Sequence, residues 1–199
     1  VSIYNYNGIS WSQLGQDIDI DHYVRSLSIS GAGNIVAISA DSSIDIGSGD
    51  EELSGYVVTY QYIGNSWSQM TNPIFPENYL ESNLSVSLSS DGGTLAIGSQ
   101  FNDENGLNAG HVRIFNWDGI SWYQIGQDIY GDLAGDRSGF SVSLSSDGNR
   151  VAVGAPYSDE LSNNSGYVRV YENIGGNWTQ IGQSILGESD YDESGRYVS

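Results

Sequence analysis

Short stretches in which apolar and polar side chains alternate recur along this chain. Residues 142–145 alternate valine and leucine with serine, and residues 167–171 alternate valine with tyrosine and arginine. Because successive side chains of an extended backbone point to opposite faces, a period of two predicts β-strands with one buried face. Two further strand candidates, 151–155 and 178–181, are rich in apolar and aromatic residues. The pattern therefore predicts four short strands in this region and an all-β fold.

The segments between these strands carry the residues that tight turns require. Asp147-Gly148 and Asp91-Gly92 separate a first from a second strand, and Gly175-Gly176 and Asp118-Gly119 separate a third from a fourth. Such dipeptides favour two-residue hairpins, because glycine and aspartate tolerate the backbone conformations that these turns need. We therefore expect each group of four strands to form an antiparallel meander.

The group of four strands repeats along the chain. One recurring phrase holds four tryptophans, at spacings of 56, 55 and 56 residues: Trp11, Trp67, Trp122 and Trp178. Four antiparallel strands in each repeat of this length are typical of a β-propeller blade. We expect the tryptophans to pack between neighbouring blades.

The repeats divide one β-propeller domain, residues 1–199, into blades. The expected boundaries are 1–22 (a partial blade), 23–78, 79–134, 135–190 and 191–199 (a second partial blade). These make about 3.5 blades, part of a larger ring, since closed propellers usually have 4–8. A seven-bladed ring is one such arrangement, and a four-bladed ring completed by a short further segment is another. An open stack of sheets or a solenoid is the alternative architecture.

The stretch SGFSVSLSSDGNRVAVGAPYSDE, residues 138–160, resembles the FG-GAP repeat of integrin α-type propellers. Ser138-Gly139-Phe140 at its start and Gly154-Ala155-Pro156 near its end carry the resemblance. In that family an Asp-rich calcium loop lies between the first two strands. Here the turn is only Ser-Ser-Asp-Gly, and one aspartate cannot supply most of the 6–8 oxygens that calcium takes. We therefore interpret Asp91 and Asp147 as turn residues and do not carry over the family's calcium sites.

Charge narrows the choice of partners. The chain has 25 acidic residues against 6 basic ones, a net charge of −19, and neither lysine nor cysteine. Such a balance argues against nucleic acid, whose phosphates need lysine and arginine, and favours cations or basic proteins. The lack of cysteine excludes disulfides and thiolate metal sites. No apolar run is long enough for a transmembrane helix, so we expect no membrane insertion.

The acidic residues are distributed unevenly among the connections. All but four fall in the second-to-third and fourth-to-first connections, which also contain all the length variation between repeats. The exceptions are Asp91, Asp118, Asp147 and Glu172. In a meander those two kinds of connection leave from the same edge, so we expect one strongly negative face. The alternative interpretation is that soluble proteins simply place charge in loops and that the tight turns have no room for it.

Two acidic segments, 16–22 and 187–195, are candidate calcium sites, although neither has EF-hand spacing. Their candidate ligands are Asp17, Asp19, Asp21, Asp190, Asp192 and Glu193. Candidate N-glycosylation sites are Asn83, Asn163 and Asn177. We expect no catalytic residue and no cofactor other than this candidate calcium. His111 takes the place of Tyr56 and Tyr167 in the sister repeats, which indicates a packing residue.

The expected function is that of a non-enzymatic extracellular structural or adhesive module. Similar FG-GAP-like repeats in large secreted proteins of marine bacteria and algae imply a cell-surface or appendage assembly, such as a flagellar hair. Rigid blades would present acidic loops for protein, glycan or cation-bridged contacts, including self-assembly into a larger structure. The alternatives are a propeller enzyme, quinoprotein-like or polysaccharide-acting, and a lectin-like glycan binder that uses exposed tyrosine and tryptophan.

Overall fold

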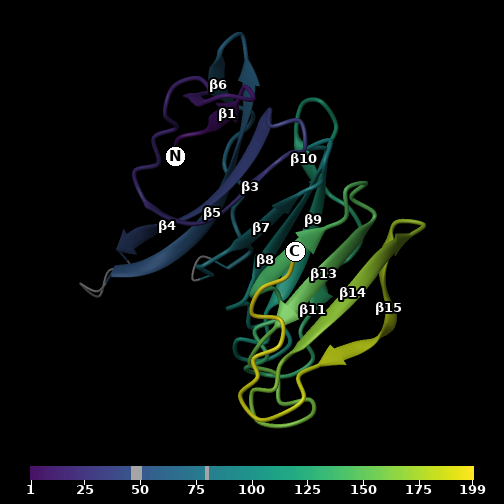
Figure 1. Cartoon of the computed structure of the whole chain (residues 1–199). Helices are drawn as coiled ribbons and strands as arrows, with labels where there is room; N and C mark the ends of the chain where they lie inside the picture. The colour runs from purple at the N-terminus through teal and green to yellow at the C-terminus, as the bar shows by residue number, and fades with distance from the viewer. Residues whose placement is uncertain (46–50, 79–80) are drawn as a thin grey trace.

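A computed structural model describes residues 1–45, 51–78 and 81–199, and within these ranges the regular structure is entirely β (Figure 1). None of the described residues forms a helix that could cross a membrane. A hairpin of β1 (Tyr4–Tyr6) and β2 (Trp11–Gln13) precedes three larger sheets. The all-β prediction is therefore confirmed.

Each of the three sheets is an antiparallel meander of consecutive strands. The first contains β3 (Tyr23–Ile29), β4 (Ile35–Asp45), β5 (Glu51–Ile63) and β6 (Ser66–Gln69). The second contains β7 (Ser85–Leu88), β8 (Thr94–Ser99), β9 (His111–Trp117) and β10 (Trp122–Gln124), with the short β11 (Ile129–Tyr130) also paired to β9. The third contains β12 (Ser141–Leu144), β13 (Arg150–Ala155), β14 (Tyr167–Ile174) and β15 (Asn177–Leu186). We call them blades 1, 2 and 3.

In blades 2 and 3 an aspartate fixes the turn between the first and second strands. Asp91 accepts hydrogen bonds from the Ser89 hydroxyl at 2.6 Å and from the Gly93 amide at 2.9 Å. Asp147 accepts in the same way from Ser145 and Asn149. Both carboxylates are therefore engaged within their own turns, as aspartate commonly is.

Apolar side chains fill the spaces between blades. Ile35, Ala37 and Val57 of blade 1 pack with side chains of blade 2, and Val112 and Ile114 of blade 2 pack with those of blade 3. Burial of this surface is the main force that holds the blades together. Each sheet alone would leave a large apolar face in water, so the blades depend on their neighbours.

Serines of the first strands link one blade to the next. The Leu88 amide donates to the Ser28 hydroxyl of blade 1, and the Leu144 amide donates to the Ser87 hydroxyl of blade 2, both at 2.9 Å. These contacts satisfy edge-strand amides that would otherwise lack a strand partner. They give a physical reason for the alternation of serine with apolar residues in these strands.

Two features depart from the expected strand lengths. The ladder between β4 and β5 continues from Asp41 opposite Gly55 to Asp45 opposite Glu51. Asp41, Asp45, Glu51 and Glu52, expected in a loop, therefore belong to strands, while Asp50 lies outside the described residues. Strand β15 likewise runs to Leu186, past a register shift between Val168 and Val170 of β14.

Candidate functional site

The long connections of the blades emerge at the opposite edge from the tight third-to-fourth turns. In Figure 1 the hairpins β5–β6 and β9–β10 lie toward the top and the β14–β15 hairpin lies at the right, at the upper end of its sheet, whereas the connections of blades 2 and 3 lie at the bottom. We call the edge that bears the long connections the loop face. Exposed carboxylates on it include Asp19, Glu77, Asp103, Glu104, Asp132, Asp159, Glu160, Glu188 and Asp190.

Three acids that were expected to contribute to this negative surface are buried instead. Asp41 pairs with Arg25 and also accepts from the Asn83 amide at 3.0 Å. Asp136 accepts from the Leu133 amide at 3.1 Å, and burial raises the pKa of its carboxyl group. Glu81 is enclosed with Ser99 and Asn102. These three carboxylates make contacts inside the fold rather than present charge at the surface.

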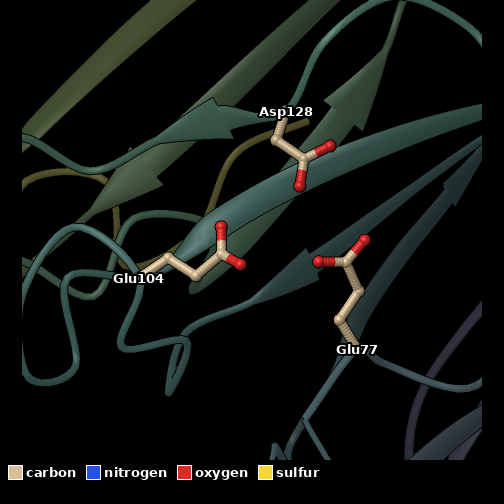
Figure 2. Close-up of side chains that lie close together, drawn as sticks. All are labelled: Glu77, Glu104 and Asp128. Carbon is tan, nitrogen blue, oxygen red and sulfur yellow. The ribbon is translucent and has the colours of Figure 1, made fainter.

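The loop face of blade 2 brings three carboxylates from distant parts of the sequence together. One oxygen from each of Glu77, Glu104 and Asp128 lies within 4.8 Å of the other two (Figure 2). Glu77 precedes β7, Glu104 follows β8, and Asp128 lies between β10 and β11. A cavity of about 310 Å³ adjoins them, lined by Glu77, Asn78, Glu81, Asn102, Asp103 and Glu104. We call the three carboxylates the blade 2 acidic cluster.

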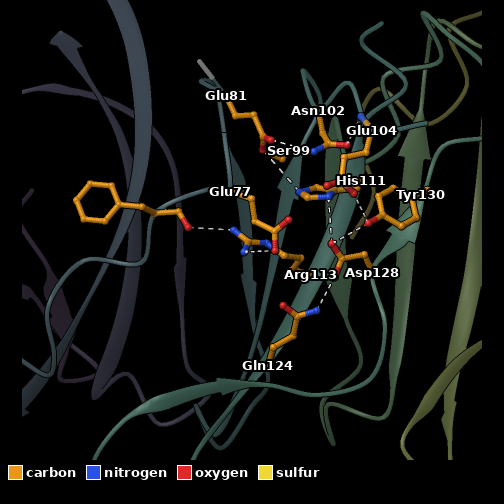
Figure 3. Close-up of polar contacts among 11 residues, drawn as sticks. Glu77, Glu81, Ser99, Asn102, Glu104, His111, Arg113, Gln124, Asp128 and Tyr130 are labelled. Carbon is orange, nitrogen blue, oxygen red and sulfur yellow. Dashed lines mark hydrogen bonds and ion pairs between the residues drawn. The ribbon is translucent and has the colours of Figure 1, made fainter. Parts of the chain in front are cut away.

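Polar neighbours hold these carboxylates in place (Figure 3). The Tyr130 hydroxyl donates to Glu104 and lies 3.4 Å from Asp128. The hydrogen bond to Glu104 raises the pKa of Tyr130 far above its ordinary value. Burial acts to raise the pKa of Asp128, but contacts with His111 and Gln124 outweigh it and hold that pKa below its usual value. Asp128 is therefore an anion at neutral pH.

His111 lies behind the cluster and is fully buried. Its Nδ1 atom is 3.4 Å from an Asp128 oxygen, and its Nε2 atom is 3.6 Å from a Glu81 oxygen. Glu81 in turn accepts from the Ser99 hydroxyl and from the side-chain amide of Asn102, the latter at 2.9 Å. His111 thus occupies a core position, as expected of a packing residue, with its ring beside that of Tyr130 and its two nitrogens facing carboxylates.

The calcium-binding candidates predicted from the sequence lie outside the blade 2 acidic cluster. Among the described residues, the blade 2 acidic cluster is the group of three whose ligand atoms converge, and no candidate from 16–22 or 187–195 belongs to it. Asp17 accepts from Ser2 and Gln13, Asp192 accepts from the Glu188 and Ser189 amides, and Glu193 pairs with Arg196. Asp19, Asp21 and Asp190 are exposed. The carboxylates of these two segments are neighbours in the sequence, but their oxygens do not form a group of three around one point.

The sequon asparagines differ in accessibility. Asn163 and Asn177 are exposed. Asn83 is half-buried in a left-handed conformation with φ of 53°, and its amide is bonded to the buried Asp41.

The meander sheets, stacked through apolar interfaces, define the class of protein: the chain is a partial β-propeller. It is similar to a solved structure, the crystal structure of the tricorn protease, with a TM-score of 0.50 and 10% sequence identity over 96% of this chain. The chain spans only 18% of that protein, so the likeness concerns the fold alone.

Residues 132–171 match the family model of the FG-GAP repeat. This range contains the first two strands of blade 3, most of the third, and part of the acidic connection before them. The chain is thus a β-propeller segment that contains a match to the FG-GAP repeat at residues 132–171, within the region where the sequence resemblance was strongest. No curated protein matches the sequence of this chain.

Proposed function

We propose that this chain is a non-enzymatic structural or adhesive module that acts outside the cell or on its surface. Its rigid blades would hold acidic loops in fixed positions for contacts with basic proteins, glycans or bridging cations. The observation that carries this proposal is the placement of exposed carboxylates on one face of a scaffold with a net charge of −19. FG-GAP repeats are typical of extracellular or surface proteins, which supports the proposed location.

The chemistry of the loop face suits binding better than turnover. The histidine that lies among carboxylates, His111, is fully buried and out of reach of a substrate. The carboxylates at the surface are instead open to macromolecules and ions. Complementary charge on a partner would steer its approach and select its orientation. We therefore propose contact rather than catalysis, with a propeller enzyme as the competing function.

A matched pair of charge variants tests the proposal. One variant neutralises four loop-face acids with Asp103→Asn, Asp159→Asn, Glu188→Gln and Asp190→Asn. The control neutralises the four acids that lie outside the long connections, three in tight turns and one in β14, with Asp91→Asn, Asp118→Asn, Asp147→Asn and Glu172→Gln. Both change the net charge equally. We expect the loop-face variant to bind a polylysine-coated sensor at least about tenfold more weakly than the control, since close charge pairs set such affinities.

Equal losses in the two variants would show that net charge, not the loop face, governs binding. A glycan array probed with the same proteins distinguishes a lectin from a charge-directed binder. Turnover of polysaccharide substrates by the parent chain would favour an enzyme instead. Immunogold labelling of intact producing cells tests the proposed location, and a signal confined to the cell interior would contradict it.

A further inference from the structure

We propose that Glu77, Glu104 and Asp128 bind a hard divalent cation, calcium being the best fit, at the loop face of blade 2. The inference deepens the proposed function, because a cation held there could bridge to a partner. It concerns binding by the chain alone, however, and can fail independently of any adhesive role.

Blade 3 contains the equivalent pocket and shows what neutralises it. Glu77, Glu104, Arg113 and Asp128 each have a counterpart 55 or 56 residues later in the chain: Asp132, Glu160, Arg169 and Ser184. In blade 3 the Arg169 guanidinium lies 2.7 Å from Asp132, 2.8 Å from Glu160 and 2.9 Å from the Ser184 hydroxyl. A built-in cation therefore satisfies that pocket through short, charge-assisted contacts.

In blade 2 the equivalent arginine, Arg113, makes only a longer ion pair with the cluster. The Arg113 guanidinium donates to the Phe75 carbonyl at 3.0 Å and comes no nearer than 3.7 Å to Glu77 (Figure 3). At the same time Asp128 replaces the neutral Ser184, so blade 2 has one more carboxylate and less compensation. Like charges this close repel one another, and a bound cation relieves that repulsion.

The buried imidazole of His111 faces the blade 2 acidic cluster from the interior of the protein. Within the described part of the chain, neither of its ring nitrogens makes a hydrogen bond, although the side chain is fully buried. Its Nδ1 atom lies 3.4 Å from Asp128 and its Nε2 atom lies 3.6 Å from Glu81, so each nitrogen faces a carboxylate without completing a hydrogen bond to it. An imidazole behind a ligating carboxylate is a familiar outer-shell arrangement that orients the ligand toward the ion. Blade 3 has Tyr167 in place of His111.

The donor set selects the class of ion. All three ligands are carboxylates, which hard cations prefer, and there is no cysteine in the chain to favour a softer metal. Calcium takes 6–8 oxygens in flexible geometry, so three carboxylates supplemented by water from the adjoining cavity can satisfy it. Magnesium demands near-ideal octahedral geometry and gives up its waters reluctantly, so it should bind more weakly.

Isothermal titration of the chain with calcium chloride tests the inference directly. We expect one saturable site in the parent chain. Asp128→Ser, which installs the residue found in blade 3, should weaken binding by about tenfold or more, since ligand charge count sets calcium affinity. Asp190→Asn removes an equal charge from an exposed position on the same face and should leave binding unchanged.

Terbium luminescence provides a second readout that does not depend on heat or stability. Tyr130 contacts two of the three carboxylates, so its excitation should sensitise a bound terbium ion, and calcium should displace that signal. Glu104→Gln is a second variant that should lose the signal even if Asp128→Ser folds poorly. Lack of saturation at millimolar calcium, or an equal loss with Asp190→Asn, would overturn the inference.

Discussion

Replacement of Trp67 tests whether the repeated tryptophans hold neighbouring blades together. Trp67 is 4% exposed, whereas Trp11, in the same repeat position, is 69% exposed. The Trp67 indole packs against Gly15 and donates from Nε1 to the Leu14 carbonyl at 2.7 Å. Both partners belong to the segment that precedes blade 1. The two tryptophans thus share a sequence phrase but differ in burial.

The burial of each tryptophan sets the expected loss of unfolding free energy. A buried tryptophan side chain removes roughly 150–250 Å² from water, which corresponds to an upper limit of about 4–6 kcal/mol at 25 cal/mol per Å². Measured Trp→Ala changes in cores are about 3–5 kcal/mol. We expect Trp67→Ala to lower the free energy of unfolding by a value in that range. Trp11→Ala should lower it by less than about 1 kcal/mol, because it loses little beyond its ring contact with Tyr6.

Urea denaturation followed by far-UV circular dichroism measures both variants against the parent chain. The midpoint should fall strongly for Trp67→Ala and little for Trp11→Ala, with similar slopes if unfolding stays cooperative. Equal midpoints for the two variants would refute the assignment of these tryptophans to interblade packing.

Further predictions concern a close backbone approach and a turn. A Cβ atom on Gly98 would lie 2.2 Å from the Gly139 carbonyl oxygen, so Gly98→Ala should destabilise the fold by about 1–3 kcal/mol. Gly93→Ala should destabilise it less, because the added Cβ would meet only the Asp91 side chain. Urea denaturation midpoints compare the two variants, and equal losses of stability would contradict this expectation. Hydrogen bonds from Ser145 and the Asn149 amide lower the pKa of Asp147 to about 2, so Ser145→Ala should raise that pKa in an NMR titration. Because the folded-state pKa is depressed, the contribution of Asp147 to stability is present above about pH 4 and is lost as the pH falls toward 2; an unchanged pKa in Ser145→Ala would refute its cause.

The fold was predictable because its signals are local and repeated. Alternation marked the strands, the Asp-Gly dipeptides marked the turns, and the tryptophan spacing gave the period. The length of β4 and β5 was not predictable, because their outer portions are polar and have no apolar alternation to mark them. A ladder between polar segments depends on pairing, which periodicity does not report.

The candidate site was harder to predict from the sequence than the fold was. Dense acidic segments drew attention to 16–22 and 187–195, but the converging carboxylates of Glu77, Glu104 and Asp128 come from three separate connections. Only the register of blade 2 brings them together. One signal was present: Asp128 stands where the sister repeat has Ser184, and His111 stands where it has Tyr167. These two substitutions with ionisable residues distinguish blade 2 from blade 3 in the sequence.

The central claim is that stacked blades position acids from distant parts of the sequence into a cation-binding pocket. Anomalous diffraction from crystals of the chain soaked in manganese, a hard divalent ion of the same ligand preference, tests it most directly. We predict a peak among Glu77, Glu104 and Asp128 and none beside Arg169. The absence of a peak at the first position, or a peak only at 187–195 or beside Asp91 or Asp147, would contradict the account.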